Sequence, residues 1–142
     1  MSRLTEQLNL KDVHHVVQCF YDKARHDADI GHYFLSIKDF TEHEHRISYF
    51  WWLALGGTTN DLEKPAPSFD MINKHIALGI TEADLSIWLK LFKQTLDEEL
   101  ETAIADSWRN KAEEIARHLK ALAIDGKAAR LQFTEPGSEN ET

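Results

Sequence analysis

Cysteine, proline and long apolar runs are scarce in this sequence. A single cysteine among 142 residues allows no intramolecular disulfide, and this favours a reducing compartment. The longest apolar runs, such as 49–55, are far too short to cross a bilayer. The first ten residues hold no apolar core of a signal peptide. We therefore expect a cytoplasmic protein without a membrane-spanning helix.

Basic residues are also few. The chain has 16 Lys and Arg against 24 Asp and Glu, a formal net charge of −8, and no cluster of basic residues. Nucleic acids and anionic membranes both attract a basic surface, so we exclude them as partners. The length of 142 residues, with 42% hydrophobic residues, fits one domain with one packed core.

Strand-like alternation of polar and apolar residues is absent, whereas helical spacing recurs. One apolar stripe predicts an amphipathic helix over about 10–26, and it consists of Val13, Val16, Val17, Phe20 and Ala24. Asp39 followed by Glu42 resembles a capping box and predicts a second long helix from about residue 40. The buried stripe of this second helix would hold His43, Ile47, Phe50, Trp51 and Ala54, with Gly56 and Gly57 ending it.

The middle of the chain predicts a loop and then a short turn. Residues 57–68 are rich in Gly, Pro, Asn and Asp, which favour loops. A short apolar segment over 71–76 follows, and it places Ile72, His75 and Ile76 on one helical face.

Two further helices are predicted in the second half. Thr81 with Asp84 predicts a capped helix over about 82–98, with an inward stripe of Leu85, Trp88, Leu89, Phe92 and Leu96. A last helix over about 102–122 would bury Ile104, Trp108, Ile115, Leu119 and Leu122.

These patterns predict one all-α domain over 1–124. We expect a disordered tail over 125–142, because it has few large apolar groups whose burial would offset the entropy of ordering.

Four residues with polar tips lie within or beside the apolar stripes: Tyr21, His43, His75 and Trp88. A polar group in a core is costly unless it has a partner, and a lone core histidine is more often hydrogen-bonded than a ligand. Four such residues that face one interior need a shared network or a shared bound group.

The order of five short motifs resembles group III truncated haemoglobins. The resemblance covers about 10–122, and its motifs are Phe20-Tyr21, Asp29-Ile30-Gly31-His32-Tyr33-Phe34, Glu42-His43 leading to Phe50-Trp51, Asn73-Lys74-His75-Ile76, and Ile87-Trp88-Leu89-Lys90-Leu91-Phe92. The resemblance implies a reduced globin fold, in which helices are sandwiched two on two around haem b. It also implies a bacterial cytoplasm as the usual setting.

The resemblance implies a role for each matching residue. His75 matches the proximal iron ligand, and Phe34 matches the phenylalanine that packs against the haem face. Tyr21, His43 and Trp88 match the distal residues that stabilise a bound ligand, and His43 is also a candidate sixth iron ligand.

The chemistry of these residues agrees with that assignment. Neutral imidazole is a good iron ligand, and one axial histidine leaves the opposite position open. The hydroxyl, indole and imidazole groups of the three distal residues all donate hydrogen bonds. His45 lies about 200° around the helix from His43, so only one of the two faces the haem. We expect it to be His43.

Further contacts to haem are expected at the edge of the pocket. Arg46 and Lys74 are candidates for pairing with a haem propionate, and Phe50 and Ile76 are expected to touch the haem. Cys19 is interpreted as a small core residue that points away from the haem face. The histidines at 14, 15, 26, 32 and 118 are interpreted as surface or rim positions.

A distal pocket with three donors predicts slow release of O2, because several hydrogen bonds must break. We therefore favour chemistry with NO or peroxide over bulk O2 transport, and we keep O2 storage or sensing as the alternative. O2, NO and CO are the expected small ligands. Whether the protein is an enzyme stays open. Catalytic turnover would need an external electron donor or reductase, because the chain contains no nicotinamide or flavin module.

Two other classes of protein are alternatives to a haem globin. Glu42-x-x-His45 fits half of a di-iron carboxylate signature in a non-haem bundle, but Glu114 is followed three residues later by Arg117 instead of a second histidine. A helical interaction module without a cofactor would leave the polar residues of the core unexplained.

Overall fold

The structure is a computed structural model that describes residues 6–62 and 71–126. Its elements are α1 (Leu10–Ala24), η2 (Gly31–Phe34), α2 (Phe40–Ala54), η3 (Thr59–Asp61), α3 (Met71–Leu78), α4 (Glu82–Glu99), α5 (Thr102–Leu119) and η4 (Lys120–Asp125). Most of the predicted tail and the second half of the predicted 57–68 loop lie outside the described residues, as does the side chain of Ile72.

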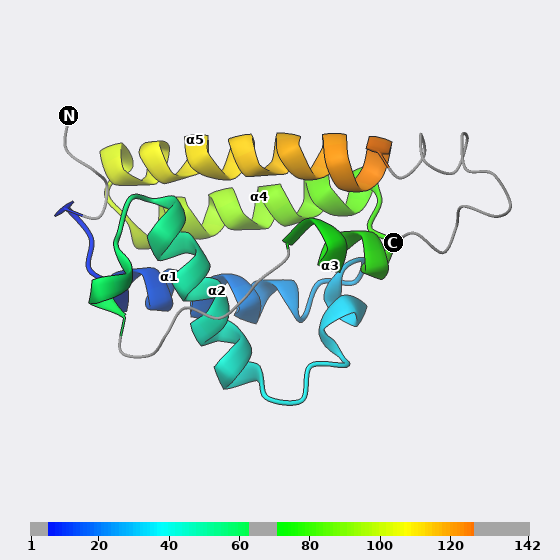
Figure 1. The fold of residues 1–142 in the computed structure, drawn as a ribbon, viewed down its shortest axis with the longest axis horizontal. Helices are drawn as coiled ribbons and strands as arrows, with labels where there is room; N and C mark the ends of the chain where they lie inside the picture. The colour runs from blue at the N-terminus through cyan, green and yellow to red at the C-terminus, as the bar shows by residue number, and fades with distance from the viewer. Residues whose placement is uncertain (1–5, 63–70, 127–142) are drawn as a thin grey trace, which may run out of the picture.

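The long helices form two pairs (Figure 1). Helices α4 and α5 run side by side along the long axis of the molecule, and α2 crosses α1 beneath them. Contacts between α1 and α4 join the two pairs, while α3 lies against η4 at one end. The predicted all-α fold with two helices on two is therefore confirmed.

Local sequence signals determine where three of these helices begin. The Asn9 side chain accepts a hydrogen bond from the Asp12 N–H at 2.8 Å, and the Asp12 carboxylate accepts one from the Asn9 N–H at 3.1 Å, which makes a full capping box at α1. Thr81 and Asp84 form the predicted capping box of α4. Asp39 accepts from the Glu42 N–H at 3.0 Å and caps α2.

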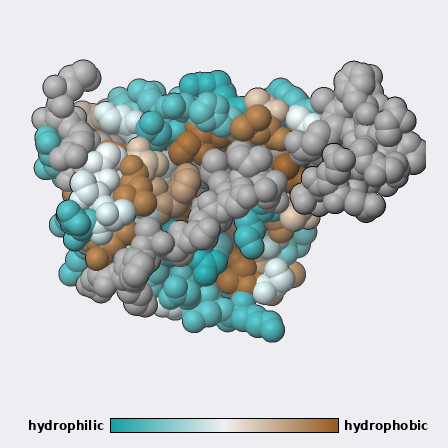
Figure 2. Space-filling view, viewed as in Figure 1, coloured by the Kyte–Doolittle hydropathy of each residue, from teal (hydrophilic) through white to brown (hydrophobic). Residues whose placement is uncertain are grey.

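The core between the helix pairs is built from aromatic rings. Phe92 of α4 is 1% exposed and stacks on Trp51 at 5.1 Å and on Trp88 at 5.3 Å between ring centroids. Trp108 of α5 is fully buried against Trp51 and Phe92. On the face shown in Figure 2, hydrophobic residues gather between hydrophilic ones at the upper and lower edges.

Helix α2 buries a different set of residues from the predicted stripe. Its buried residues are Ser48, Tyr49, Trp51 and Trp52, whereas His43, Ile47, Phe50 and Ala54 are only half-buried. Ile47 and Phe50 keep exposure because they line a cavity. The predicted buried stripe was therefore wrong for all its residues except Trp51, although Ile47, Phe50 and Trp51 do face the pocket.

The indole ring of Trp52 explains why residue 57, after the end of α2, is a glycine. Trp52 is 6% exposed, and a Cβ atom built on Gly57 would lie 2.2 Å from the Trp52 Nε1. Any residue but glycine would displace this ring. The chain therefore turns back on Trp52 at the end of α2.

The end of the last helix differs from the prediction. The regular helix α5 ends at Leu119, and a wider π-type turn, η4, continues to Asp125. The wider turn changes which of its side chains face the core. Ala123 is buried, whereas Leu122, which was predicted to be buried, is 51% exposed. Helical structure therefore reaches the first residue of the predicted tail.

Among the helices that the structure describes, none combines the length and apolar character that a bilayer crossing needs.

Candidate functional site

A pocket opens between the two helix pairs. It holds about 890 Å³ of atom-free space, part of it at the open mouth, and the lining is mostly apolar. Its walls come from all five α-helices and η2: Val17, Phe20, Tyr21, Ile30, Tyr33, Phe34, Ile47, Phe50, Trp51, His75, Leu78, Ile80, Asp84, Leu85, Trp88, Phe92, Ile115 and Leu119.

His75 is the histidine among the residues that line this pocket. It is half-buried near the C-terminal end of α3. Gly79 follows α3 with φ +69°, and its N–H bonds to the Ile76 carbonyl at 3.0 Å. The left-handed conformation that glycine permits ends α3 one turn after His75, which leaves this short helix beside the pocket.

Tyr21 and His43 face each other across the contact between α1 and α2. The His43 Nε2 lies 3.0 Å from the Tyr21 hydroxyl, and the edges of Phe34 and Phe40 pack around the tyrosine ring. Tyr21 lines the pocket, whereas His43 reaches it only through Tyr21. Their hydrogen bond makes a polar pair beside a pocket whose lining is mostly apolar.

Burial determines the protonation states of this pair. It raises the pKa of the Tyr21 hydroxyl well above its ordinary value, so the phenol keeps its proton. Burial, and then the positive charge of Arg46, lower the pKa of His43, so the neutral imidazole is favoured. A neutral His43 has one N–H and one lone pair, and its tautomer decides which group donates.

Trp88 forms part of the pocket wall that α4 contributes. Its ring is half-buried, lines the pocket and stacks on Phe92 with an interplanar angle of 5°. Phe20 of α1 meets both rings edge-on. This packing holds the indole in one orientation.

The charged residues predicted at the pocket edge differ in their surroundings. The Nε of Arg46 is buried and has no hydrogen-bond partner among the described residues. Lys74 is exposed. Ile76 is not among the lining residues, and packs against a second apolar cluster that contains Leu85 and Leu119.

One histidine and the cysteine depart from their predicted surroundings. His14 is half-buried and not a surface residue. It stacks on His45 with ring centroids 4.5 Å apart, on a different side of α2 from His43, as the helical spacing predicts. Cys19 does not line the pocket, but it is half-buried beside His15 and lies outside the core cluster.

One polar pair at the pocket was not predicted from the sequence. The Tyr33 hydroxyl donates a short hydrogen bond to Asp84, and both residues line the pocket. This bond raises the pKa of Tyr33 to about 12 and ties η2 to the start of α4. The only signal in the sequence was the capping role of Asp84, which does not indicate a partner 51 positions away.

The residues of the pocket fit a haem group. An apolar cavity lined by aromatic rings suits a flat porphyrin, and a histidine in the lining suits the iron. Arg46 does not line the pocket, but its buried Nε, without a partner among the described residues, suits a propionate acceptor. The half-signature of a di-iron site has no such support, because the His45 ring stacks on His14 and belongs to no metal-ligand cluster among the described residues.

Comparison with known proteins gives three similar relatives. The chain is 29% identical over 127 residues to the group 3 truncated hemoglobin ctb of Campylobacter jejuni, covering 82% of this chain and 92% of the relative. It resembles the crystal structure of a group III truncated hemoglobin from Campylobacter jejuni with a TM-score of 0.69 and 25% identity, covering 82% of this chain and 91% of that one.

The third relative is the 2/2 hemoglobin from Synechococcus sp., whose structure carries a covalently attached heme. It matches with a TM-score of 0.71 and 21% identity, and the match covers 86% of this chain and 98% of that one. At this identity the likeness shows the fold alone.

A family model described as bacterial-like globin matches residues 6–125, nearly the whole described chain. The resemblance to group III truncated haemoglobins and the expected haem cofactor are thereby confirmed. The chain belongs to the bacterial-like globin family and is a haem protein that binds small gaseous ligands.

Proposed function

We propose that this globin holds haem b through His75 and binds O2 or another diatomic ligand beside Tyr21, His43 and Trp88. The observation that carries the proposal is the pocket itself. One lining histidine comes from α3, and the donors Tyr21 and Trp88 come from α1 and α4. When bound, haem would supply an iron that His75 holds and that binds O2, NO or CO.

Residues at the rim would orient the haem. Arg46 is proposed to pair with a propionate, because its buried Nε lacks an acceptor in the part of the chain that the structure describes. The exposed Lys74 is the second candidate. Phe34 and Phe50 line the pocket and would contact the porphyrin. Ile76 would hold α3 in place through its packing against Leu85 and Leu119.

The proton on Tyr21 decides what the distal side offers to a ligand. If His43 donates from Nε2 to the phenol oxygen, the phenol O–H is left to point into the pocket. If the Nε2 accepts the phenol proton, Tyr21 offers only lone pairs. A ligand that gains negative charge favours the first arrangement. The lowered pKa of His43 supports this arrangement, because only a neutral imidazole can either donate to or accept from the Tyr21 hydroxyl through its Nε2.

Two or three donors around a ligand predict slow dissociation, so we propose NO or peroxide chemistry in preference to bulk O2 transport. Conversion of one NO and one O2 to nitrate consumes one electron. The chain contains no second cofactor domain in its described part, so an external electron donor or reductase would supply that electron.

Absorption spectra of the ferric, ferrous and CO-treated ferrous protein test haem binding. We expect one haem per chain, a sharp Soret band, and a shift of that band on addition of CO. His75→Ala should retain far less haem, while the matched control His118→Ala on the exposed face of α5 should retain it. Equal retention by both variants would contradict the role of His75. The ferrous spectrum also reports whether His43 occupies the sixth position.

Rapid mixing of the O2-saturated ferrous protein with NO tests the proposed chemistry. We expect nitrate to form faster than with free haem. If it does not, and peroxide consumption is also no faster than with free haem, the protein is better described as an O2 storage or sensing globin.

A further inference from the structure

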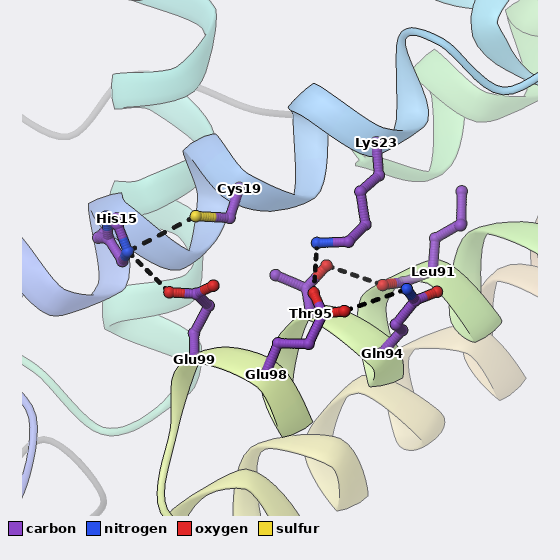
Figure 3. A network of polar contacts seen from close by, with 8 residues as sticks. All are labelled: His15, Cys19, Lys23, Leu91, Gln94, Thr95, Glu98 and Glu99. Atoms are coloured by element: carbon purple, nitrogen blue, oxygen red, sulfur yellow. Dashed lines mark hydrogen bonds and ion pairs between the residues drawn. The ribbon is translucent and has the colours of Figure 1, made fainter.

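Three metal-ligand side chains converge outside the haem pocket. His15 and Cys19 lie one turn apart on α1, and Glu99 is the last residue of α4. The His15 Nε2 is 2.9 Å from the Glu99 Oε1 and 3.5 Å from the Cys19 Sγ. The three ligand atoms all lie within 4.8 Å of one another. Figure 3 shows the dashed lines that run from the His15 ring nitrogen to the Cys19 sulfur and to the Glu99 carboxylate.

The two separations from the His15 Nε2 are close to the edges of a zinc tetrahedron. Zn–N and Zn–S bonds of about 2.05 and 2.3 Å at the tetrahedral angle place N and S about 3.6 Å apart, and the observed distance is 3.5 Å. The corresponding N to O edge is about 3.4 Å, so Glu99 needs to move by only about half an ångström from its present 2.9 Å. The His15 side chain is 61% exposed and the Glu99 side chain 28% exposed, so the histidine has the more room to make this adjustment.

A single nitrogen atom is the common partner in this cluster. The His15 Nε2 faces both a carboxylate oxygen and a thiol sulfur. One Nε2–H proton serves the carboxylate, and then no lone pair remains for the thiol. A cation at the centre would satisfy all three atoms at once. It would take the imidazole lone pair, the carboxylate charge and the thiolate together.

The neighbouring lysine leaves the Glu99 carboxylate available to bind a cation. Lys23 is the cation beside this cluster in Figure 3, and it pairs with Glu98 at 2.8 Å and not with Glu99. Burial, and then the charges of Glu99, Asp22 and Glu98, raise the pKa of the Cys19 thiol, with Lys23 opposing. The free thiol is therefore protonated near neutral pH, and a cation that binds the thiolate must displace its proton.

We propose that His15, Cys19 and Glu99 form a Zn²⁺ site, with water as the fourth ligand, that links α1 to the C-terminal end of α4. The mixed N, S and O donor set selects zinc over magnesium and calcium, which prefer oxygen ligands alone. The site lies outside the pocket lining. It connects the two helices that carry Tyr21 and Trp88.

Calorimetric titration of the haem-loaded, tag-free chain with ZnCl2 tests the proposal. We expect one Zn²⁺ per chain, release of about one proton from the thiol, and no comparable binding of Mg²⁺ or Ca²⁺. Cys19→Ser, His15→Ala and Glu99→Gln should each weaken binding by at least the roughly 10- to 100-fold that loss of an outer-shell partner costs. His118→Ala is the matched control and should bind Zn²⁺ like the unmodified chain.

Alkylation of the thiol gives a second readout that does not depend on calorimetry. Cys19 is the only cysteine of the chain, so the rate of alkylation reports on this site alone. We expect Zn²⁺ to slow the reaction in the unmodified chain and to slow it much less in His15→Ala. Unchanged Zn²⁺ affinity in Cys19→Ser, or alkylation that Zn²⁺ does not slow, would overturn the proposal. The Soret band and the far-ultraviolet circular dichroism verify that each variant is folded.

Discussion

At the scale of single residues, the hydrogen bond between Tyr21 and His43 is the feature with the clearest chemical consequence. Helical spacing predicted that His43 and not His45 faces the pocket side, and the 3.0 Å contact with Tyr21 agrees with this. The spacing did not predict that His43 acts through Tyr21 instead of lining the pocket itself. Only the crossing of α2 over α1 determines which side chain lies in front.

Removing one hydroxyl group tests this arrangement. In Tyr21→Phe we expect O2 to dissociate about 10- to 100-fold faster, because a hydrogen bond to a partly charged ligand contributes roughly 1.5–3 kcal/mol. The measurement is the O2 dissociation rate, followed by replacement with CO. Tyr49→Phe is the matched control, because Tyr49 is buried at 8% exposure but does not line the pocket. Similar rates in the two variants would mean that Tyr21 does not donate to the ligand.

At the scale of helices, the contact between α1 and α2 carries a pair of stacked histidines. His14 and His45 have an interplanar angle of 13°, and the His14 Nε2 is buried with no hydrogen-bond partner among the described residues. Burial, and then the charges of His45 and His15, lower the pKa of His14. Protonation of this ring therefore opposes the packing of the two helices.

The sign of the pH effect follows from that direction. Because the pKa of His14 is lower in the folded chain than the unfolded value of 6.5, the unfolded chain binds more protons below this pH. The stability that the neutral ring contributes is present above pH 6.5 and is lost as the pH falls through the folded pKa. His43 acts in the same direction.

Replacement of His14 by phenylalanine should keep a ring and remove the charge. We expect His14→Phe to lose less stability than the unmodified chain between about pH 7 and pH 5. The difference should be a few tenths of a kcal/mol, because the ring is partly exposed and screened. Urea unfolding at each pH measures it, and the difference at about pH 8, where His14 is neutral in both states, reports packing alone. Parallel pH profiles would contradict the prediction.

At the scale of the whole molecule, the pocket is a shared product of five helices. Residues of all five helices line it, and they enclose about 890 Å³ of atom-free space, part of it open to solvent. The lining residues Ile47 and Phe50 are half-buried for this reason. The folded protein is stabilised when a large apolar group binds in such a cavity.

Haem removal should therefore destabilise the fold. A ligand present at about 1,000 times its dissociation constant adds about 4 kcal/mol of stability, which corresponds to a rise in Tm of about 10–20 °C for a chain of this size. We expect the haem-free protein to melt lower by about that amount in circular dichroism scans. His75→Ala should show a much smaller difference with and without haem. Equal melting temperatures with and without haem would contradict haem binding in this cavity.

The sequence by itself determined the helices, their starts and the group that they bind. Periodic apolar stripes and the caps at Asp39 and Thr81 are local signals, because a helix contacts its own neighbours three and four residues away. The ordered motifs that contain Tyr21 and His75 were enough to predict a haem globin, and the family match confirms it.

Tertiary structure alone decided which residues meet across helices. The Tyr33 bond to Asp84, the stacking of His14 on His45 and the convergence of Cys19 with Glu99 join positions 51, 31 and 80 residues apart. Periodicity tells which side of a helix faces inward, but the angle at which two helices cross selects the partner. The exposure of Ile47, Phe50 and Leu122 followed the same rule, because a cavity and a wide turn arise only when the helices are assembled.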